Sequence, residues 1–242
     1  MNFSEIDLDE THIRLTTDLM NHELKRYVFS IRRDLKNYVL RNRDFLLSFE
    51  PIKVEENVPL IIKTMVEASE ISDVGPMACV AGTISQLSLS YLMNEGSKYS
   101  IVENGGDIAI INDEEVLCGI YSNNEVLGND IAFRINPRSN PLGICSSSGK
   151  IGHSISFGDA DSVCVISKSA AFSDGLATRI ANDILGESSE DKIANGLECC
   201  ENYREFFDGV LIISDSHVGS IGRLPEIVET KDFDVNFQPH NY

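Results

Sequence analysis

This sequence has few basic residues for its length. Its 242 residues include 20 Lys and Arg against 38 Asp and Glu, which gives a formal net charge of −18 and an isoelectric point near 4.6. Binding to nucleic acid or to an anionic membrane needs Lys and Arg clustered at the phosphates, so the composition argues against both partners. A phosphoryl ligand would have to be held by backbone N–H groups, by a few basic residues or by a cation.

Signals for export, membrane insertion and common phosphate loops are also missing. The acidic opening MNFSEIDLDE has no basic segment followed by an apolar one, and no apolar run approaches the roughly 20 residues of a membrane span. The sequence therefore predicts a cytoplasmic protein. The phosphate loop Gly-x-x-x-x-Gly-Lys-Ser/Thr, the fingerprint Gly-x-Gly-x-x-Gly and the elbow Gly-x-Ser-x-Gly are absent.

The six cysteines contain no Cys-x-x-Cys pair, so neither a zinc ribbon nor a thioredoxin-like motif is indicated. In a reducing compartment we expect free thiols. Cys118 and Cys164 fall in apolar strand patterns and are expected in the core. Cys145 differs, because it lies beside serines and eight residues before His153, conditions that can favour a thiolate.

Apolar periodicity predicts a mixture of helices and strands. Strands are predicted over residues 11–16, 98–103, 108–111, 116–121, 130–135 and 162–167, and as a closing antiparallel meander over 208–214, 217–221 and 226–230. Helices are predicted over residues 18–42, 59–69, 77–94, 170–185 and 190–200, with a loop or short turn at 45–51 and a turn at 137–141. Because these elements do not alternate as regular βαβ units, the pattern favours a mixed α/β, or α+β, fold over a doubly wound sheet.

We expect one domain over residues 1–242. It would comprise an N-terminal strand and helices (1–73), a core that carries the site (74–186), and a C-terminal helix and meander (187–242). Basic residues concentrate in and just after the first predicted helix: Arg26, Arg32, Arg33, Lys36, Arg41 and Arg43. This surface could meet an acidic partner or a second copy of the chain, which would make a homo-oligomer, although a solvated face is the more common outcome.

Polar and small residues gather between residues 143 and 183. Asp174 and Thr178 are four apart on a predicted helix, so they share a face and can bind a hard cation such as Mg²⁺. The alternative is an acid that complements its own helix dipole, with Thr178 bonding back to the helix. Upstream, Asn104-Gly105-Gly106-Asp107 fits either a tight hairpin turn or a close approach of backbone to a ligand.

A small-residue loop is predicted from Cys145 to Gly149. Ser146, Ser147, Ser148 and Gly149 could present hydroxyl and N–H groups to a phosphate, or could form a plain surface loop. His153 is a candidate general acid or base, or a phosphate contact, although a lone His in a loop is more often simply exposed.

Taken in order, these segments resemble the ApbE superfamily, the FAD:protein FMN transferases. The segments that carry the resemblance are AGTISQ (81–86), VENGGDI (102–108), SSSG (146–149), His153, SVCVIS (162–167) and SDGLAT (173–178). DVGPMA, IVENGGDI and GHSISFG look closest to an uncharacterised branch from mostly anaerobic archaea and bacteria. The resemblance implies a single ApbE-like fold with largely antiparallel sheets and packed helices.

The resemblance also implies roles for individual residues. Asp174 and Thr178 match Mg²⁺ ligands, and the carbonyl of Ala78 falls where a backbone ligand would lie. His153 matches the histidine implicated in flavin transfer, while residues 104–107 and 147–149 match walls of the pocket for FAD or FMN.

Some positions depart from the family pattern. Ala81 and Gln86 replace the lysine and aspartate of the KGYAVD motif, and residues 154–158 replace the D-P-R-T-G that should follow the histidine. These departures affect the flavin contacts more than the cation site. Binding of a small phosphorylated ligand with Mg²⁺ is therefore the first hypothesis. A sulfur-handling protein that uses Cys145, and an oligomeric module with a vestigial site, are the alternatives.

Overall fold

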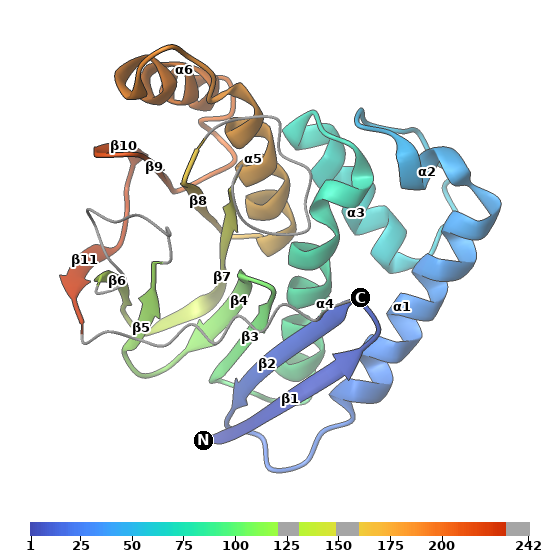
Figure 1. Ribbon diagram of the computed structural model, residues 1–242. Coiled ribbons are helices and arrows are strands. Elements are labelled where there is room, and N and C mark those ends of the chain that lie inside the picture. Colours follow the sequence, from blue (N-terminus) through green and yellow to red (C-terminus); the bar gives the residue numbers. More distant parts are fainter. Residues whose placement is uncertain (121–130, 149–159, 231–242) are drawn as a thin grey trace.

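The computed structural model describes residues 1–120, 131–148 and 160–230. Within these residues the main sheet has eight strands in the order β1-β2-β3-β4-β7-β8-β9-β10, and each neighbouring pair is antiparallel (Figure 1). These strands are β1 (Asn2–Leu8), β2 (Thr11–Thr17), β3 (Ser100–Asn104), β4 (Asp107–Asn112), β7 (Arg138–Ser147), β8 (Ser162–Ser167), β9 (Gly209–Ser214) and β10 (His217–Gly222). A second sheet has the order β11-β6-β5 and contains β5 (Val116–Gly119), β6 (Ile131–Ile135) and β11 (Glu226–Glu229).

Helices cover one face of the main sheet and the small sheet covers the other. The helical elements are α1 (Leu24–Arg41), α2 (Arg43–Leu47), α3 (Leu60–Ser72), a 3₁₀ turn η1 (Pro76–Cys79), α4 (Val80–Asn94), α5 (Ala170–Asp183) and α6 (Ser189–Glu201). In β8, Val163 and Val165 pack with the helices while Cys164 and Ile166 pack with the small sheet. Since both faces of β8 are covered, its sequence is apolar without alternation.

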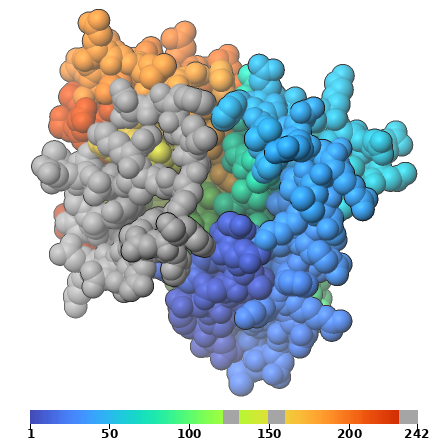
Figure 2. Space-filling model, turned by 45° about the vertical axis from the view of Figure 1, so that its right-hand side comes forward, coloured from blue at the N-terminus to red at the C-terminus, as the bar shows by residue number. Residues whose placement is uncertain are grey.

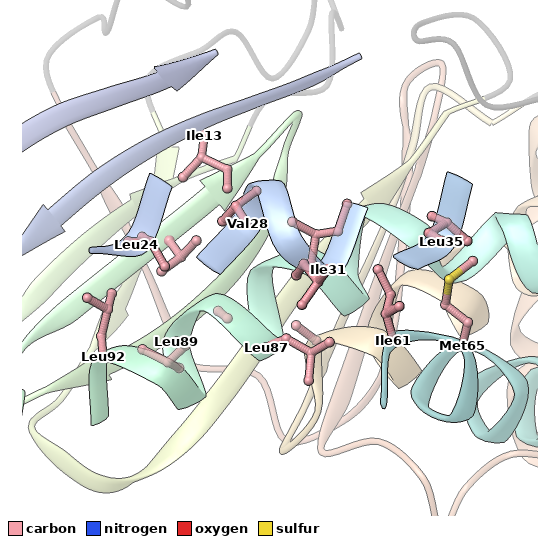
Figure 3. Close-up of a cluster of buried hydrophobic side chains, with 14 of the residues drawn as sticks. Ile13, Leu24, Val28, Ile31, Leu35, Ile61, Met65, Leu87, Leu89 and Leu92 are labelled. Atoms are coloured by element: carbon pink, nitrogen blue, oxygen red, sulfur yellow. The ribbon is translucent and has the colours of Figure 1, made fainter. Parts of the chain in front are cut away.

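The N-terminal half of the core joins α1, α3 and α4 to strands β1 to β4. Leu24, Val28, Ile31 and Leu35 form the buried stripe of α1, at spacings of three and four residues (Figure 3). Figure 2 shows the β1–β2 hairpin and helices α1 to α3 gathered on one side of the molecule. None of the described helices is both long and apolar enough to cross a lipid bilayer.

Part of the predicted basic surface is used inside the fold. Arg32 is buried and bonds to Thr11 at the start of β2 and to Glu10, and Lys36 bonds to Asp9; Asp9 and Glu10 form the turn between β1 and β2. These contacts fix α1 on the N-terminal hairpin.

The main departures from the sequence prediction concern irregular ends and distant pairings. β1 was not predicted, and the first helix begins at Leu24 rather than residue 18, because the Asp18 carboxylate accepts bonds from Ser97 Oγ (2.6 Å) and Lys98 N (3.0 Å). The predicted loop at 45–51 contains part of the short helix α2.

The predicted turn at 137–141 was wrong, and so was the place of the third strand in the closing meander, although residues 226–229 do form a strand. Residues 138–141 lie in β7, where the pairing with β4 shifts register between Ile110 and Asn112, an irregularity that accommodates Pro141. β11 leaves the predicted meander and pairs with β6 in the second sheet, while β9 and β10 do form a hairpin.

The main sheet takes strands from all three of the expected chain segments: β1 and β2, then β3, β4, β7 and β8, and finally β9 and β10. We infer from this continuity that the chain is one domain.

Candidate functional site

The turn between β3 and β4 is a two-residue hairpin with Gly105 and Gly106 at its tip. Their φ angles are +65° and +99°, and Asn104 pairs with Asp107 across the turn. Positive φ at both central positions is what a type I′ turn needs, so the hairpin interpretation of these glycines holds. The turn places Asn104 and Asp107, both buried, beside the start of α4: Asn104 Nδ2 donates to the Ala81 carbonyl (3.3 Å) and Ser85 Oγ donates to the Asp107 carbonyl (2.8 Å).

The start of α4 is completed by an acid from another helix. The N-cap residue of α4, Cys79, makes no side-chain capping bond. Instead Asp174 Oδ2 in α5 accepts a hydrogen bond from the Gly82 N–H at 2.8 Å, and the backbone of Ala81 also bonds to this carboxyl group. Asp174 therefore does complement a helix N-terminus, but that of α4 rather than of its own helix.

Glycine allows α4 and α5 to come this close. A Cβ on Gly82 would lie 2.3 Å from the Ala170 carbonyl oxygen and 2.6 Å from Asp174 Cβ. A Cβ on Gly175 would lie 2.8 Å from Cys79 Sγ. The small residues at the start of α4 are thus explained by contact with α5 at Gly82.

Asp107 and Asp174 form a buried pair of interacting carboxyl groups. Burial raises the pKa of Asp107 to about 7, against smaller opposing effects of hydrogen bonds from Cys145 and the Ser146 backbone. Burial and then the charge of Asp107 raise the pKa of Asp174 well above its usual value. Asp107 Oδ1 is buried and has no hydrogen-bond partner among the described residues. Two acids in this state favour either a proton or a cation between them.

Strand alternation places Cys145 and Ser147 on the same face as Asp107. The register that pairs Ile108 with Ile144 sets Cys145 next to Asp107, on the face that α4 and α5 cover. The predicted loop from Cys145 was wrong, since Cys145 to Ser147 belong to β7 and Ser148 follows the strand. Ser147 Oγ is buried and, within the described chain, has no hydrogen-bond partner.

The structure also argues against the thiolate that the sequence context of Cys145 could have favoured. The side chain is fully buried and its Sγ donates to the Ala170 carbonyl at 3.2 Å. Burial, followed by the charges of Asp107 and Asp174, raises the pKa of the Cys145 thiol well above its usual range. A nearby protonated histidine would lower the pKa of the thiol. The two acids raise it, and the sequence did not show that they lie beside Cys145.

The remaining predicted residues fall partly outside the described chain. Thr178 lies buried one helical turn after Asp174, and Ala78 belongs to the 3₁₀ turn that leads into α4. His153 and Gly149 lie outside the described residues. In the part of the chain that the structure describes, no three His, Cys, Asp or Glu side chains converge as a metal-binding group.

Gln86 has a role that its sequence position alone did not show. Its Oε1 accepts from Ser169 Oγ (2.7 Å) and from the Ala171 N–H (3.1 Å). Ser169 is the N-cap of α5 and its Oγ accepts from the Phe172 N–H. Gln86 therefore ties α4 to the N-terminus of the helix that carries Asp174. The only signal in the sequence was that Gln86 departs from the family motif.

Comparison with known proteins places this chain in a family. The family model described as AbpE bacteria matches residues 1–196. A UPF0280 protein of Methanobrevibacter smithii is 59% identical over 236 residues, which cover 97% of this chain and 99% of that protein. A UPF0280 protein of Methanothermobacter thermautotrophicus is 47% identical over 225 residues, covering 93% of this chain and 87% of that protein.

Two solved structures show the same fold at low sequence identity. The flavin transferase ApbE from Vibrio cholerae has a TM-score of 0.59 and 14% identity, with 96% of this chain and 97% of that chain covered. The apo form of the Pseudomonas stutzeri flavinyl transferase ApbE has a TM-score of 0.57 and 12% identity, with 96% and 95% covered. The resemblance inferred from the sequence is confirmed: this chain belongs to the AbpE bacteria family, has the ApbE fold, and has archaeal UPF0280 proteins among its relatives.

Proposed function

We propose that this protein binds a phosphorylated ligand of the flavin or nucleotide class together with a divalent cation, at the place where β4, β7 and the start of α4 meet α5. The observation that carries the proposal is the buried pair Asp107 and Asp174, with one carboxyl oxygen of Asp107 left without a hydrogen-bond partner among the described residues. In a chain of net charge −18, two adjacent buried acids are costly as a structural device alone. A bound cation would offset their charge.

The donor set suits Mg²⁺ better than a transition metal. Mg²⁺ is usually bound by one or two carboxylates and completes its octahedron with water and phosphate oxygens. Asp107 and Asp174 would supply the carboxylates, and the Thr178 hydroxyl and the Ala78 carbonyl are the further oxygen donors that the family resemblance suggests. When bound, such a cation neutralises charge on ligand phosphates, which this acidic chain cannot do with many basic side chains.

Flavin is the first ligand to test, because two structural neighbours are named as flavin or flavinyl transferases. The proposal is for binding rather than transfer. Ala81 and Gln86 replace the charged residues of the transferase motif, and Gln86 Oε1 is already bonded to α5. Ser147, with its buried hydroxyl, and the exposed Gly105 would contact the ligand.

The two alternatives have less support. A persulfide chemistry at Cys145 would need an accessible thiol of low pKa, whereas this thiol is buried with a raised pKa. An oligomeric module built on the basic helix α1 would lose two of its cations, Arg32 and Lys36, to contacts with the N-terminal hairpin.

The test is calorimetric titration with FAD, FMN and ADP, each in Mg²⁺ and in EDTA, on the wild type and on Asp174→Asn. The asparagine oxygen can still accept from the Gly82 N–H, so the variant removes the charge but keeps this hydrogen bond. Asp113→Asn, at an exposed acid after β4, is the matched control. We expect Mg²⁺-dependent affinity to fall at least about tenfold in Asp174→Asn alone. Equal Mg²⁺-dependent binding in all three proteins, or no binding by the wild type, would reject the proposal.

A further inference from the structure

A second concave site lies beside the acid pair and is not lined by it. A cavity of about 120 Å³ forms where the middle of α4, β4 and β7 meet the N-terminus of α5. Its floor consists of Leu89, Ala109, Leu142 and Ala170. Each of these residues is no more than 3% exposed; Leu89, Ala109 and Ala170 belong to the core cluster under the helices, whereas Leu142 packs with the small sheet on the other face.

The rim of the cavity is polar and carries one positive charge. Lys168 is exposed at the connection from β8 to α5. Gln86 also lines the cavity. Its Oε1 is held by Ser169 Oγ and the Ala171 N–H, so its amide is oriented by two donors. The Nε2 group, which then points away from those donors, has no partner in the described part of the chain and keeps two N–H groups for a ligand.

This combination of an apolar floor, one lysine and one amide donor defines a ligand by its chemistry. An anionic group would meet Lys168 and the Gln86 amide, while an apolar body would fill the space over Leu89 and Ala109. Because the rim offers a single cation, it balances the one charge of a carboxylate. A phosphate with a charge near two would keep an unbalanced charge beside an apolar floor.

We propose that this cavity binds a small monocarboxylic acid with a short apolar tail. An engineered cavity of about 150 Å³ in another protein holds benzene, so the space here suits a tail of about four to six carbon atoms. Recognition would come from the charge on Lys168 and the two N–H groups of Gln86. Ser90, whose hydroxyl donates to the Gln86 carbonyl, closes the rim and does not donate to the ligand.

The experiment uses the full chain and two pairs of probes, pentanoate with pentanamide and benzoate with benzamide, with binding measured by saturation-transfer NMR. Each amide matches its acid in shape and lacks the charge. We expect the two acids to saturate a site in the millimolar range and the amides to bind at least about fivefold more weakly, as for the loss of one partly exposed charge contact.

Two variants, Lys168→Met and Ala109→Val, locate the site, and a third serves as the control. Lys168→Met keeps the apolar stem and removes the charge, and it should weaken acid binding at least about fivefold. Lys98→Met, at an exposed lysine before β3, is the control and should bind as the wild type does. Ala109→Val narrows the floor and should weaken acid and amide alike. Absence of saturable acid binding, equal binding of acids and amides, or equal effects of Lys168→Met and Lys98→Met would each overturn the proposal.

Discussion

The buried acid Asp107 should make the stability of the metal-free protein fall as the pH rises. Its pKa rises from 3.8 to about 7 on folding, chiefly because of burial. The folded state therefore holds a proton that the unfolded chain has already lost between about pH 4 and pH 7. Over this window the free energy of unfolding decreases with increasing pH, and a shift of this size corresponds to about 4 kcal/mol above pH 7. Asp174, whose pKa is also raised, acts in the same direction.

Asp107→Asn is the perturbation that isolates this effect. Asparagine has the shape of the protonated acid and cannot ionise, so the variant should match the wild type near pH 4 and exceed its unfolding free energy at pH 8 by up to about 4 kcal/mol. Urea unfolding followed by circular dichroism, in EDTA from pH 4.5 to 8, measures both curves. Asp113→Asn, at an exposed acid, should follow the wild type. If the pH dependence of Asp107→Asn is parallel to that of the wild type, the reasoning about the acid pair is refuted.

Three further outcomes follow from the geometry of the site. Gly82→Ala should destabilise the fold by about 1 to 3 kcal/mol in the same urea assay, because the new Cβ would lie 2.3 Å from the Ala170 carbonyl oxygen; an unchanged midpoint would contradict the close crossing of α4 and α5. Gly106→Ala should cost about 1 to 3 kcal/mol through its φ of +99°, and it should do so although no atom lies near the added Cβ. The Cys145 thiol should resist iodoacetamide in the native protein and react only after unfolding, as peptide mass mapping would show; rapid native labelling would restore the sulfur-handling hypothesis.

Local chemistry predicted the parts of the fold that depend on short stretches of sequence. The β-branched run from Ser162 to Ser167 was predicted as a strand with the observed limits. Gly96 ends α4 with a φ of +99°, as expected for a glycine just after a helix. Gly105 and Gly106 form the predicted turn. In each case the decisive interaction lies within a few residues along the chain.

The features that could not be predicted depend on contacts between segments far apart in the sequence. β1 alternates irregularly and has few apolar residues, so its pairing with β2 stabilises it rather than its own pattern. The Asp174 carboxylate caps a helix that begins 94 residues earlier in the chain, at Val80. The burial of Cys145 likewise depends on β7 lying between β4 and β8. A serine-rich segment next to a histidine gave no indication of that placement.

The order of strands in the main sheet has a consequence for how the chain folds during synthesis. From β1 to β10 the spatial order follows the order of the sequence, interrupted only where β5 and β6 leave for the small sheet. Each new strand can therefore join the free edge of those already made, although β3 can pair with β2 only after residues 18–99 have been made. The small sheet is different, because β6 receives its second neighbour only when residues 226–229 leave the ribosome. Until then the apolar face that β5 and β6 cover lacks its last strand, so this sheet should be the final part of the protein to become stable.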